Sequence, residues 1–141
     1  MARVDFYVLE RVDERARLML ACRLAEKAYR LDNTVYVHTQ TRADAERLDE
    51  LLWTFRDGSF VPHALLSDAD MADSAVMIGS DTDSVAPCDL LINLCDEIPD
   101  LAAGFPRVAE IVTKDERCRT LSRKRFVAYR DGGHTIETHK L

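Results

Sequence analysis

The sequence predicts an α/β fold: a mostly parallel central sheet with helices on both faces. Two observations predict it. Short β-branched and aromatic runs alternate with longer segments whose apolar residues recur every three to four positions. The run at residues 90–94 (LLINL) is apolar at almost every position, as expected of a central strand covered on both faces. We therefore expect a Rossmann-like three-layer arrangement, with residues 1–141 forming a single domain.

The first half of the chain predicts two strand–helix units. The strands have buried, β-branched character, and each following segment places its apolar residues on one helical face. In the second helix Thr41 is a candidate N-cap, with Asp44 three residues later in a variant of the capping box. Asp57-Gly58 is expected to end that helix. The strands are expected at residues 5–9 and 34–39, and the helices at 13–31 and 41–55.

The second half predicts shorter strands and less regular connections. The apolar segment 59–63 (SFVPH) contains a proline and is expected to be a connection, and 81–87 a polar loop. Gly132-Gly133 is expected to stop the last helix before an edge strand. Strands are expected at 75–78, 90–94, 108–112 and 135–138, a short helix at 99–105 and a last helix at 115–130.

Charge is distributed unevenly along the chain. The net charge of −6 argues against a protein whose whole surface binds a phosphate backbone. Residues 66–100 contain nine acidic residues and no Lys or Arg, so the rest of the chain carries +3. Residues 114–131 contain seven basic and three acidic residues. An acidic protein with one basic segment suggests a local anion site.

Composition also predicts a cytosolic protein. No apolar run approaches the length of a membrane helix, and the N-terminal segment lacks the pattern of a signal peptide. The four cysteines form no CxxC pair, so we interpret them as small apolar residues of the core rather than metal ligands. They are Cys22, Cys88, Cys95 and Cys118.

Motifs of catalysis are missing from the sequence. There is no GxGxxG, GxxxxGK[ST], GxSxG or HExxH, and five glycines are too few for a phosphate-cradling loop. Asp81-Thr82-Asp83 lacks the rest of a calcium loop and is interpreted as a solvated loop, and His38 as a plain strand residue. A small nucleotide-dependent enzyme on a Rossmann-like sheet is the alternative function that these absences disfavour.

The last predicted helix carries an unusual face. With about 100° per residue, Arg119, Arg123, Phe126 and Arg130 fall within one narrow arc. An aromatic ring among arginines suits a ligand that has both a carboxylate and an apolar group. The alternative is a solvated basic face with an incidental Phe126, which this periodicity places outside the core. The expected core side holds Cys118, Leu121, Ala128 and Tyr129.

Trp53, the only tryptophan, falls outside the apolar stripe of its helix. It lies roughly 140° from Leu48 on the helical wheel. Such a residue is either an exposed interface anchor or covered by the following loop, in which Phe60, Val61 and Pro62 are apolar.

Four motifs along the whole chain together resemble a known family. They are DFYVL near the N-terminus, RLDELLW from Arg47, SFVPH from Ser59 and RKRFVAYR from Arg123. In this order they are similar to the chi subunit of bacterial DNA polymerase III. The resemblance implies an α/β fold without catalytic activity or cofactor, in the clamp-loader assembly. It also implies pairing with the psi subunit, binding to the acidic C-terminal tail of single-stranded DNA-binding protein and, in some bacteria, a helicase partner. Contact with DNA would be indirect, and no membrane is involved.

The resemblance also assigns two sets of residues. Where the family can have tyrosine and lysine in the tail pocket, this chain has Phe126 and Val127, so fewer polar contacts are expected unless Lys124 or Arg130 substitutes. The residues matching the tail pocket are Val112, Arg119, Arg123 and Phe126. The surface facing psi or a helicase would include Trp53 and Phe60, with Val61 and Pro62.

Overall fold

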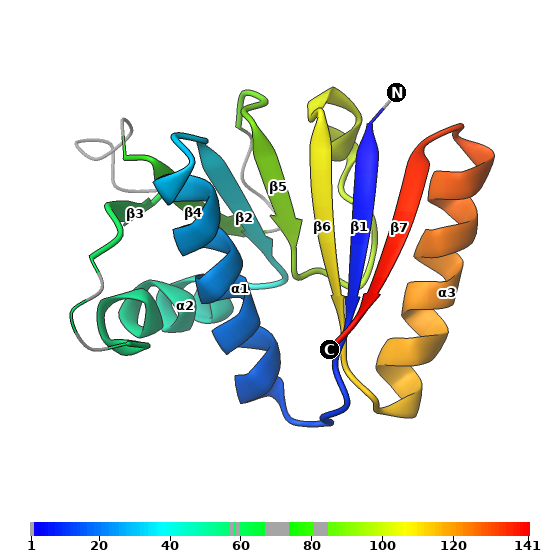
Figure 1. The fold of residues 1–141 in the computed structure, drawn as a ribbon, viewed down its shortest axis with the longest axis horizontal. Helices are drawn as coiled ribbons and strands as arrows, with labels where there is room; N and C mark the ends of the chain where they lie inside the picture. The colour runs from blue at the N-terminus through cyan, green and yellow to red at the C-terminus, as the bar shows by residue number, and fades with distance from the viewer. Residues whose placement is uncertain (1, 57, 59, 67–73, 81–84) are drawn as a thin grey trace.

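The computed structural model describes residues 2–56, 58, 60–66, 74–80 and 85–141 (Figure 1). These form one sheet of seven strands in the order β3-β4-β2-β5-β6-β1-β7. Each neighbouring pair is parallel, which confirms the predicted sheet. The strands are β1 (Arg3–Val8), β2 (Val35–Thr39), β3 (His63–Leu65), β4 (Val76–Ser80), β5 (Leu90–Asn93), β6 (Arg107–Val112) and β7 (Thr135–Lys140).

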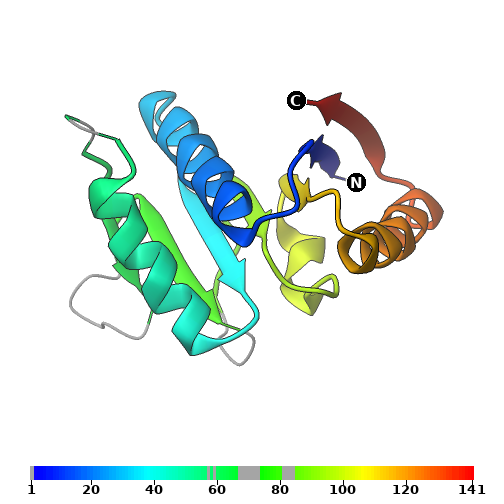
Figure 2. The ribbon, with the colours of Figure 1, turned by 90° about the horizontal axis from the view of Figure 1, so that it is seen from below.

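Helices cover both faces of the sheet, as predicted. Figure 2 shows the sheet separating α1 from α3 and the short 3₁₀ helix η2. Each long helix begins at an N-cap whose side chain accepts a backbone N–H: Asp13, Thr41 and Asp115. Gly133, with φ of 82°, follows the end of α3. The helices are α1 (Glu14–Arg30), α2 (Arg42–Thr54), η2 (Asp100–Gly104) and α3 (Glu116–Asp131).

The core consists of one apolar cluster on each face. Successive residues of β2 divide between them, because side chains of a strand alternate: Val35 and Val37 pack beneath α1 and α2, whereas Tyr36 packs on the other side. Leu48 of α2 and Ile111 of β6 belong to the first cluster. Burying each such aliphatic side chain contributes about 1.5–3 kcal/mol. The predicted apolar stripes of α1 and α2 therefore face the sheet.

One strand was not predicted. His63 to Leu65 form β3 at the sheet edge beside β4, where we had expected a proline-containing connection to end. Three residues are too few to show the period of a strand, so its pairing depends on β4. The expected helix end at Asp57, the acidic loop with Asp81 to Asp83 and most of the acidic segment 66–73 lie outside the described residues.

The opposite edge is held by a buried carboxylate. Asp5 of β1 contacts Arg3, Arg107 of β6 and His139 of β7, whose Nε2 lies 2.9 Å from Asp5 Oδ1. Burial would raise the pKa of Asp5, but the hydrogen bonds from His139 and Arg3, together with the charge of Arg107, outweigh it and hold the pKa below its ordinary value. The His139 ring also stacks on Tyr7 at 4.8 Å between centroids. Three neighbouring strands are thus joined through one side chain.

Replacing Asp5 by Asn should therefore have a pH-dependent effect on stability. A carboxylate with a lowered pKa stabilises the fold above its unfolded-state pKa, about 3.9, and this contribution is lost as pH falls through the folded-state value. We expect Asp5→Asn to lower the melting temperature at neutral pH, and the difference from wild type to shrink in acid. Thermal unfolding across a pH series measures it, with exposed Asp131→Asn as control. A difference independent of pH would contradict the assignment.

Candidate functional site

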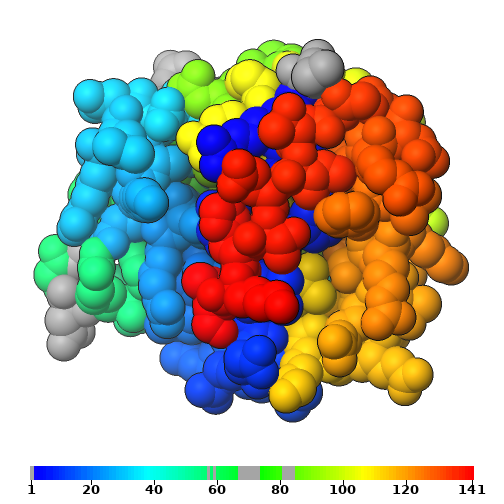
Figure 3. Space-filling view, turned by 45° about the vertical axis from the view of Figure 1, so that its right-hand side comes forward, coloured from blue at the N-terminus to red at the C-terminus, as the bar shows by residue number. Residues whose placement is uncertain are grey.

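A shallow pocket lies where α3 passes beside the β7 edge of the sheet. Figure 3 shows α3 and β7 side by side at the surface. Its floor comes from β1 and β6 and is apolar, and its walls come from α3 and β7. The pocket has a volume of about 210 Å³. It is lined by Phe6, Val8, Val112, Arg119, Ser122, Arg123, Phe126 and Thr138.

The structure brings four predicted residues together at this pocket: Val112, Arg119, Arg123 and Phe126. Lys124 and Arg130, which we had considered as substitutes, are exposed and are not among the lining residues. Arg130 instead pairs with Asp131 at 3.4 Å.

Two expectations about the faces of α3 were wrong. Phe126 was placed outside the core, but its ring is half-buried and lies 5.5 Å from the ring of Phe6, centroid to centroid. Ala128, expected on the core side, is exposed. The helix is rotated so that Ser122, Arg125 and Tyr129 are its buried residues, and Phe126 borders the core while forming a pocket wall.

The positive charge of the pocket has no ion-pair partner among the residues that the structure describes. Neither Arg119 nor Arg123 forms an ion pair with another described residue, and both side chains are exposed. By contrast, Arg117 of the same helix is paired with Asp96 at 2.6 Å. Two free guanidinium groups beside an apolar floor can bind a carboxylate and bury an attached side chain.

A buried polar network under α3 was missed by sequence reasoning. Glu110 of β6 accepts hydrogen bonds from Arg125 Nε at 3.1 Å, Tyr129 Oη at 2.7 Å and Asn93 Nδ2 at 2.9 Å. Burial raises the pKa of Glu110, and these three partners oppose the rise. A signal was available, because Arg125 lies at about 240° from Arg119 on the helical wheel, within the expected core arc.

Hydrogen bonds join the segments that follow the carboxyl ends of β2 and β5 to each other and to two helices. Arg17 of α1 donates to the Leu94 carbonyl at 3.1 Å, Gln40 accepts from the Asp96 N–H at 3.0 Å and Arg125 donates to the Asp96 carbonyl at 2.7 Å. Open α/β sheets usually bind nucleotides at this edge. In this chain the contacts at this edge tie the segment after β5 to α1, to the residue after β2 and to α3.

A second predicted group lies at the other end of the sheet, on α2 and the segment before β3. Trp53 and Phe60 are 55% and 66% exposed, and their ring centroids are 6.0 Å apart. Pro62, two residues after Phe60, is half-buried. Val61, in contrast, is only 1% exposed and packs in the core, so its side chain cannot form part of an exposed surface.

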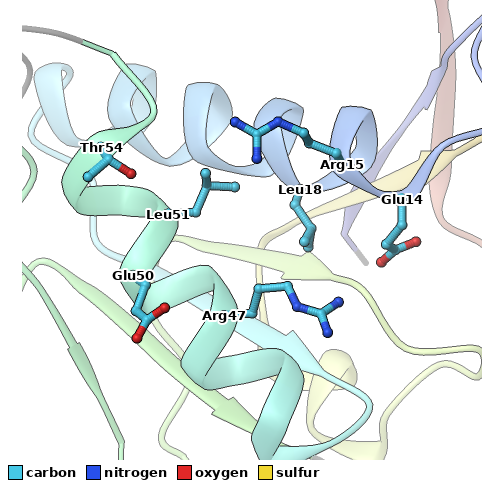
Figure 4. Close-up of a pocket in the computed structure, with 7 residues that line it drawn as sticks. All are labelled: Glu14, Arg15, Leu18, Arg47, Glu50, Leu51 and Thr54. Atoms are coloured by element: carbon cyan, nitrogen blue, oxygen red, sulfur yellow. The ribbon is translucent and has the colours of Figure 1, made fainter.

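The groove between α1 and α2 was not predicted. Figure 4 shows Leu18 of α1 and Leu51 of α2 pointing into the space between the helices. Arg15 and Arg47 are at its rim, and its volume is about 430 Å³. Its shape depends on how closely two helices pack, which helical periodicity alone does not give.

The cysteines agree with the interpretation as core residues. All four thiols are free, Cys22 and Cys95 are buried, and Cys88 and Cys118 are half-buried. Burial raises the pKa of Cys22 to about 12. Among the residues that the structure describes, no three His, Cys, Asp or Glu side chains cluster as metal ligands would. Over the same part of the chain, no helix is both long and apolar enough to cross a membrane.

Comparison with known proteins identifies the family. The family described as DNA polymerase III chi subunit, HolC, matches residues 1–137. The chain belongs to this family. A protein from Pseudomonas aeruginosa named DNA polymerase III subunit chi is 42% identical, over 100% of this chain and 98% of its own length. The protein of the same name from Escherichia coli is 31% identical, covering 98% and 97%. The chain is thus a chi subunit, an accessory protein of DNA replication.

Solved structures of proteins with low sequence identity share this fold. The C-terminal domain of the DEAD-box protein Dbp5 superposes with a TM-score of 0.62 at 14% identity, covering 97% of this chain and 89% of that one. A DEAD-box protein from Methanococcus jannaschii gives 0.56 at 16% identity, covering 98% and 42%. At such identities the likeness establishes the α/β fold alone.

Replacing Arg125 by Ala should destabilise the chi subunit strongly. The change would leave the buried Glu110 carboxylate without its cation, and breaking a buried pair typically costs about 3–5 kcal/mol of unfolding free energy. The neighbouring Lys124→Ala, on an exposed position of the same helix, should stay within about 0.5 kcal/mol of wild type. Denaturant unfolding measures both, and equal stabilities would show that the network contributes little.

Proposed function

We propose that this chi subunit is a non-catalytic adaptor of the clamp-loader complex. In this proposal it pairs with the psi subunit and binds the acidic C-terminal tail of single-stranded DNA-binding protein at the α3 pocket. It would thereby reach DNA only through its partners, in the cytoplasm at replication forks. The observation that carries the proposal is the pocket itself, in which Arg119 and Arg123, without an ion-pair partner in the described part of the chain, flank an apolar floor.

The size and chemistry of the pocket support a peptide terminus over a nucleotide. Its 210 Å³ is below the roughly 300–1,000 Å³ of pockets that enclose drug-sized ligands. A terminal phenylalanine could lie against Phe6, Val112 and Phe126, while its carboxylate meets the guanidinium groups. Acidic residues preceding the terminus would be attracted by the basic residues of α3.

Two positions at the pocket differ from the tyrosine and lysine that the family can have there. Phe126 offers its ring but no hydroxyl, and Val127 is 42% exposed beside it. We therefore propose that the carboxylate is bound by arginine alone, with the apolar contact supplying more of the affinity than where tyrosine and lysine are present.

The tail proposal predicts that the free peptide carboxylate is required. A peptide ending in acidic residues followed by Pro-Phe should bind, and amidation of its terminus should abolish most of the binding. Arg123→Ala should cost about 1.5–3 kcal/mol, the usual value of a hydrogen bond to a charged group. Lys124→Ala is the matched control for loss of charge: Lys124 lies outside the pocket, so its replacement should weaken binding less than Arg123→Ala, and only through the salt-screened attraction of the acidic residues. Equal affinities for the free-acid and the amidated peptide, measured by calorimetry, would contradict the proposal.

We propose that Trp53 and Phe60 form the surface that binds psi or a helicase. The rings are adjacent and exposed, and aromatic anchors of this kind typically contribute 2 kcal/mol or more to an interface, as an order-of-magnitude value. β3 and β7 are opposite edges of the sheet, so this surface and the α3 pocket are separate (Figure 1).

Mutation should therefore separate the two surfaces. The double variant Trp53→Ala, Phe60→Ala should lose binding to psi in a pull-down and keep its affinity for the tail peptide. Because both side chains are exposed, the melting temperature should change little. A variant that melts several degrees lower and still binds psi would show that the rings only pack on each other.

A further inference from the structure

β7 is an edge strand with one unpaired side. Among the described strands it pairs with β1 alone. The N–H groups of Thr135 and Leu141, at the two ends of the pairing, donate to the carbonyl oxygens of Ala2 and Val8. Because the register is constant between these ends, the residues at odd positions are the ones that bond to β1. The residues between them direct their N–H and C=O groups outward, where no described strand pairs with them: Ile136, Thr138 and Lys140.

The outer side of β7 is open and regular. Figure 2 shows β7, in dark red, at the end of the sheet, with α3 beside one of its faces and no described element beyond its outer edge. The strand has six residues without proline, glycine or a bulge, whereas the opposite edge strand, β3, has three. A long regular edge is a template for pairing with another chain, and a short one offers little. β7 is therefore the edge at which this sheet can gain a strand.

The unpaired edge continues into the α3 pocket. Thr138 is paired with Phe6, and the side chains of both line the pocket. Thr138 thus presents its side chain to the pocket and its backbone N–H and C=O to the open edge. Val8 ends β1 and Arg119 lies in the first turn of α3, so the pocket lies toward the carboxyl end of the strands. A chain that ends in the pocket can approach it from the direction of Ile136, alongside β7.

The charges beside this edge favour an acidic chain. Lys140 is exposed and points to the face that α3 covers, and like Arg119 and Arg123 it has no ion-pair partner among the described residues. Glu137 of β7 points to the opposite face, where its charge acts on Arg3. A second copy of β7 would bring these cations together, whereas an acidic strand would meet opposite charge.

We propose that the acidic segment of the tail pairs with β7 and adds to the sheet as a further parallel strand. The terminal phenylalanine then lies in the pocket, and the residues before it bond to the outward groups of β7. Proline has no N–H, so the acidic residues that precede Pro-Phe form these bonds. Main-chain bonds supply affinity, and alternate side chains of the tail face the basic side of α3. The proposal rests on the tail binding proposed above and gives the tail a second contact, outside the pocket.

Amide hydrogen exchange measures the pairing directly. In the free protein the N–H groups of Glu137 and His139 bond to β1 and should exchange slowly. Those of Ile136 and Thr138 face solvent and should exchange fast. Saturation with a peptide of acidic residues ending in Pro-Phe should slow exchange at Ile136 and Thr138 several-fold. Acetylated Pro-Phe is the control, because it fills the pocket without the acidic segment and should leave both groups fast.

Backbone methylation of the peptide is a second test that leaves the protein unchanged. In a paired strand, the N–H groups of alternate residues face the neighbouring strand. Methylating the backbone nitrogen of every second acidic residue should therefore weaken binding several-fold in one register and little in the other, as measured by calorimetry. Both methylated peptides keep their charge and their terminal phenylalanine, so the pocket contact and the electrostatic attraction are the same in both.

The outcomes separate this proposal from the tail binding on which it rests. If the acidic peptide does not bind, the tail binding is wrong and the strand pairing is wrong with it. If the peptide binds without slowing exchange at Ile136 and Thr138, or binds equally in both methylation registers, the tail occupies the pocket alone and only the strand pairing is wrong. Exchange that slows at these residues with protein concentration, without peptide, would show pairing of two copies and would also overturn the proposal.

Discussion

The buried contact between Glu110 and Arg125 determines which residues of α3 line the candidate pocket. A charged pair at the centre of a fold is tolerated only when its remaining polar atoms are satisfied, and here Asn93 and Tyr129 complete the set. The pair sets which side of α3 faces β6. With Arg125 turned inward, Arg119 and Arg123 necessarily face outward above the floor formed by β1 and β6.

The parallel sheet separates the two proposed partner surfaces by its full width. β3 and β7 are its edges, and the aromatic pair and the α3 pocket are found at these opposite ends. Between them, hydrogen bonds of Arg17 and Gln40 hold the segment that follows β5. The two surfaces of the proposal therefore lie on opposite edges of one sheet, so in the proposal each partner has a surface of its own.

Hydrophobic periodicity predicted the elements that bury a single face. It failed for β3, whose formation depends on pairing with β4. The strands around Tyr36 and Leu91 and the apolar stripes of α1 and α2 are local patterns, so they were predicted correctly. The three residues of β3 become a strand only because β4 offers partners, which no short window of sequence reveals. Val61 lies in a segment whose sequence is typical of a loop. Its burial depends on the packing of β3 beside β4, which a short window of sequence does not show. Arg125 shows a different limit: its position on the helical wheel is central to the core, but its charge suggested the surface.

Net charge is therefore a poor guide to where this protein can bind an anion, and unpaired charge is a better one. The chain is acidic overall, and most basic residues of its one basic segment are already paired: Lys114 with Glu10, Arg117 with Asp96, Arg125 with Glu110 and Arg130 with Asp131. Pairing cancels their field beyond a few ångströms in salt. Arg119, Arg123 and Lys124 have no ion-pair partner among the described residues, and of these three only the two arginines line the pocket. The proposed preference for an anion therefore rests on where the unpaired cations lie rather than on the net charge.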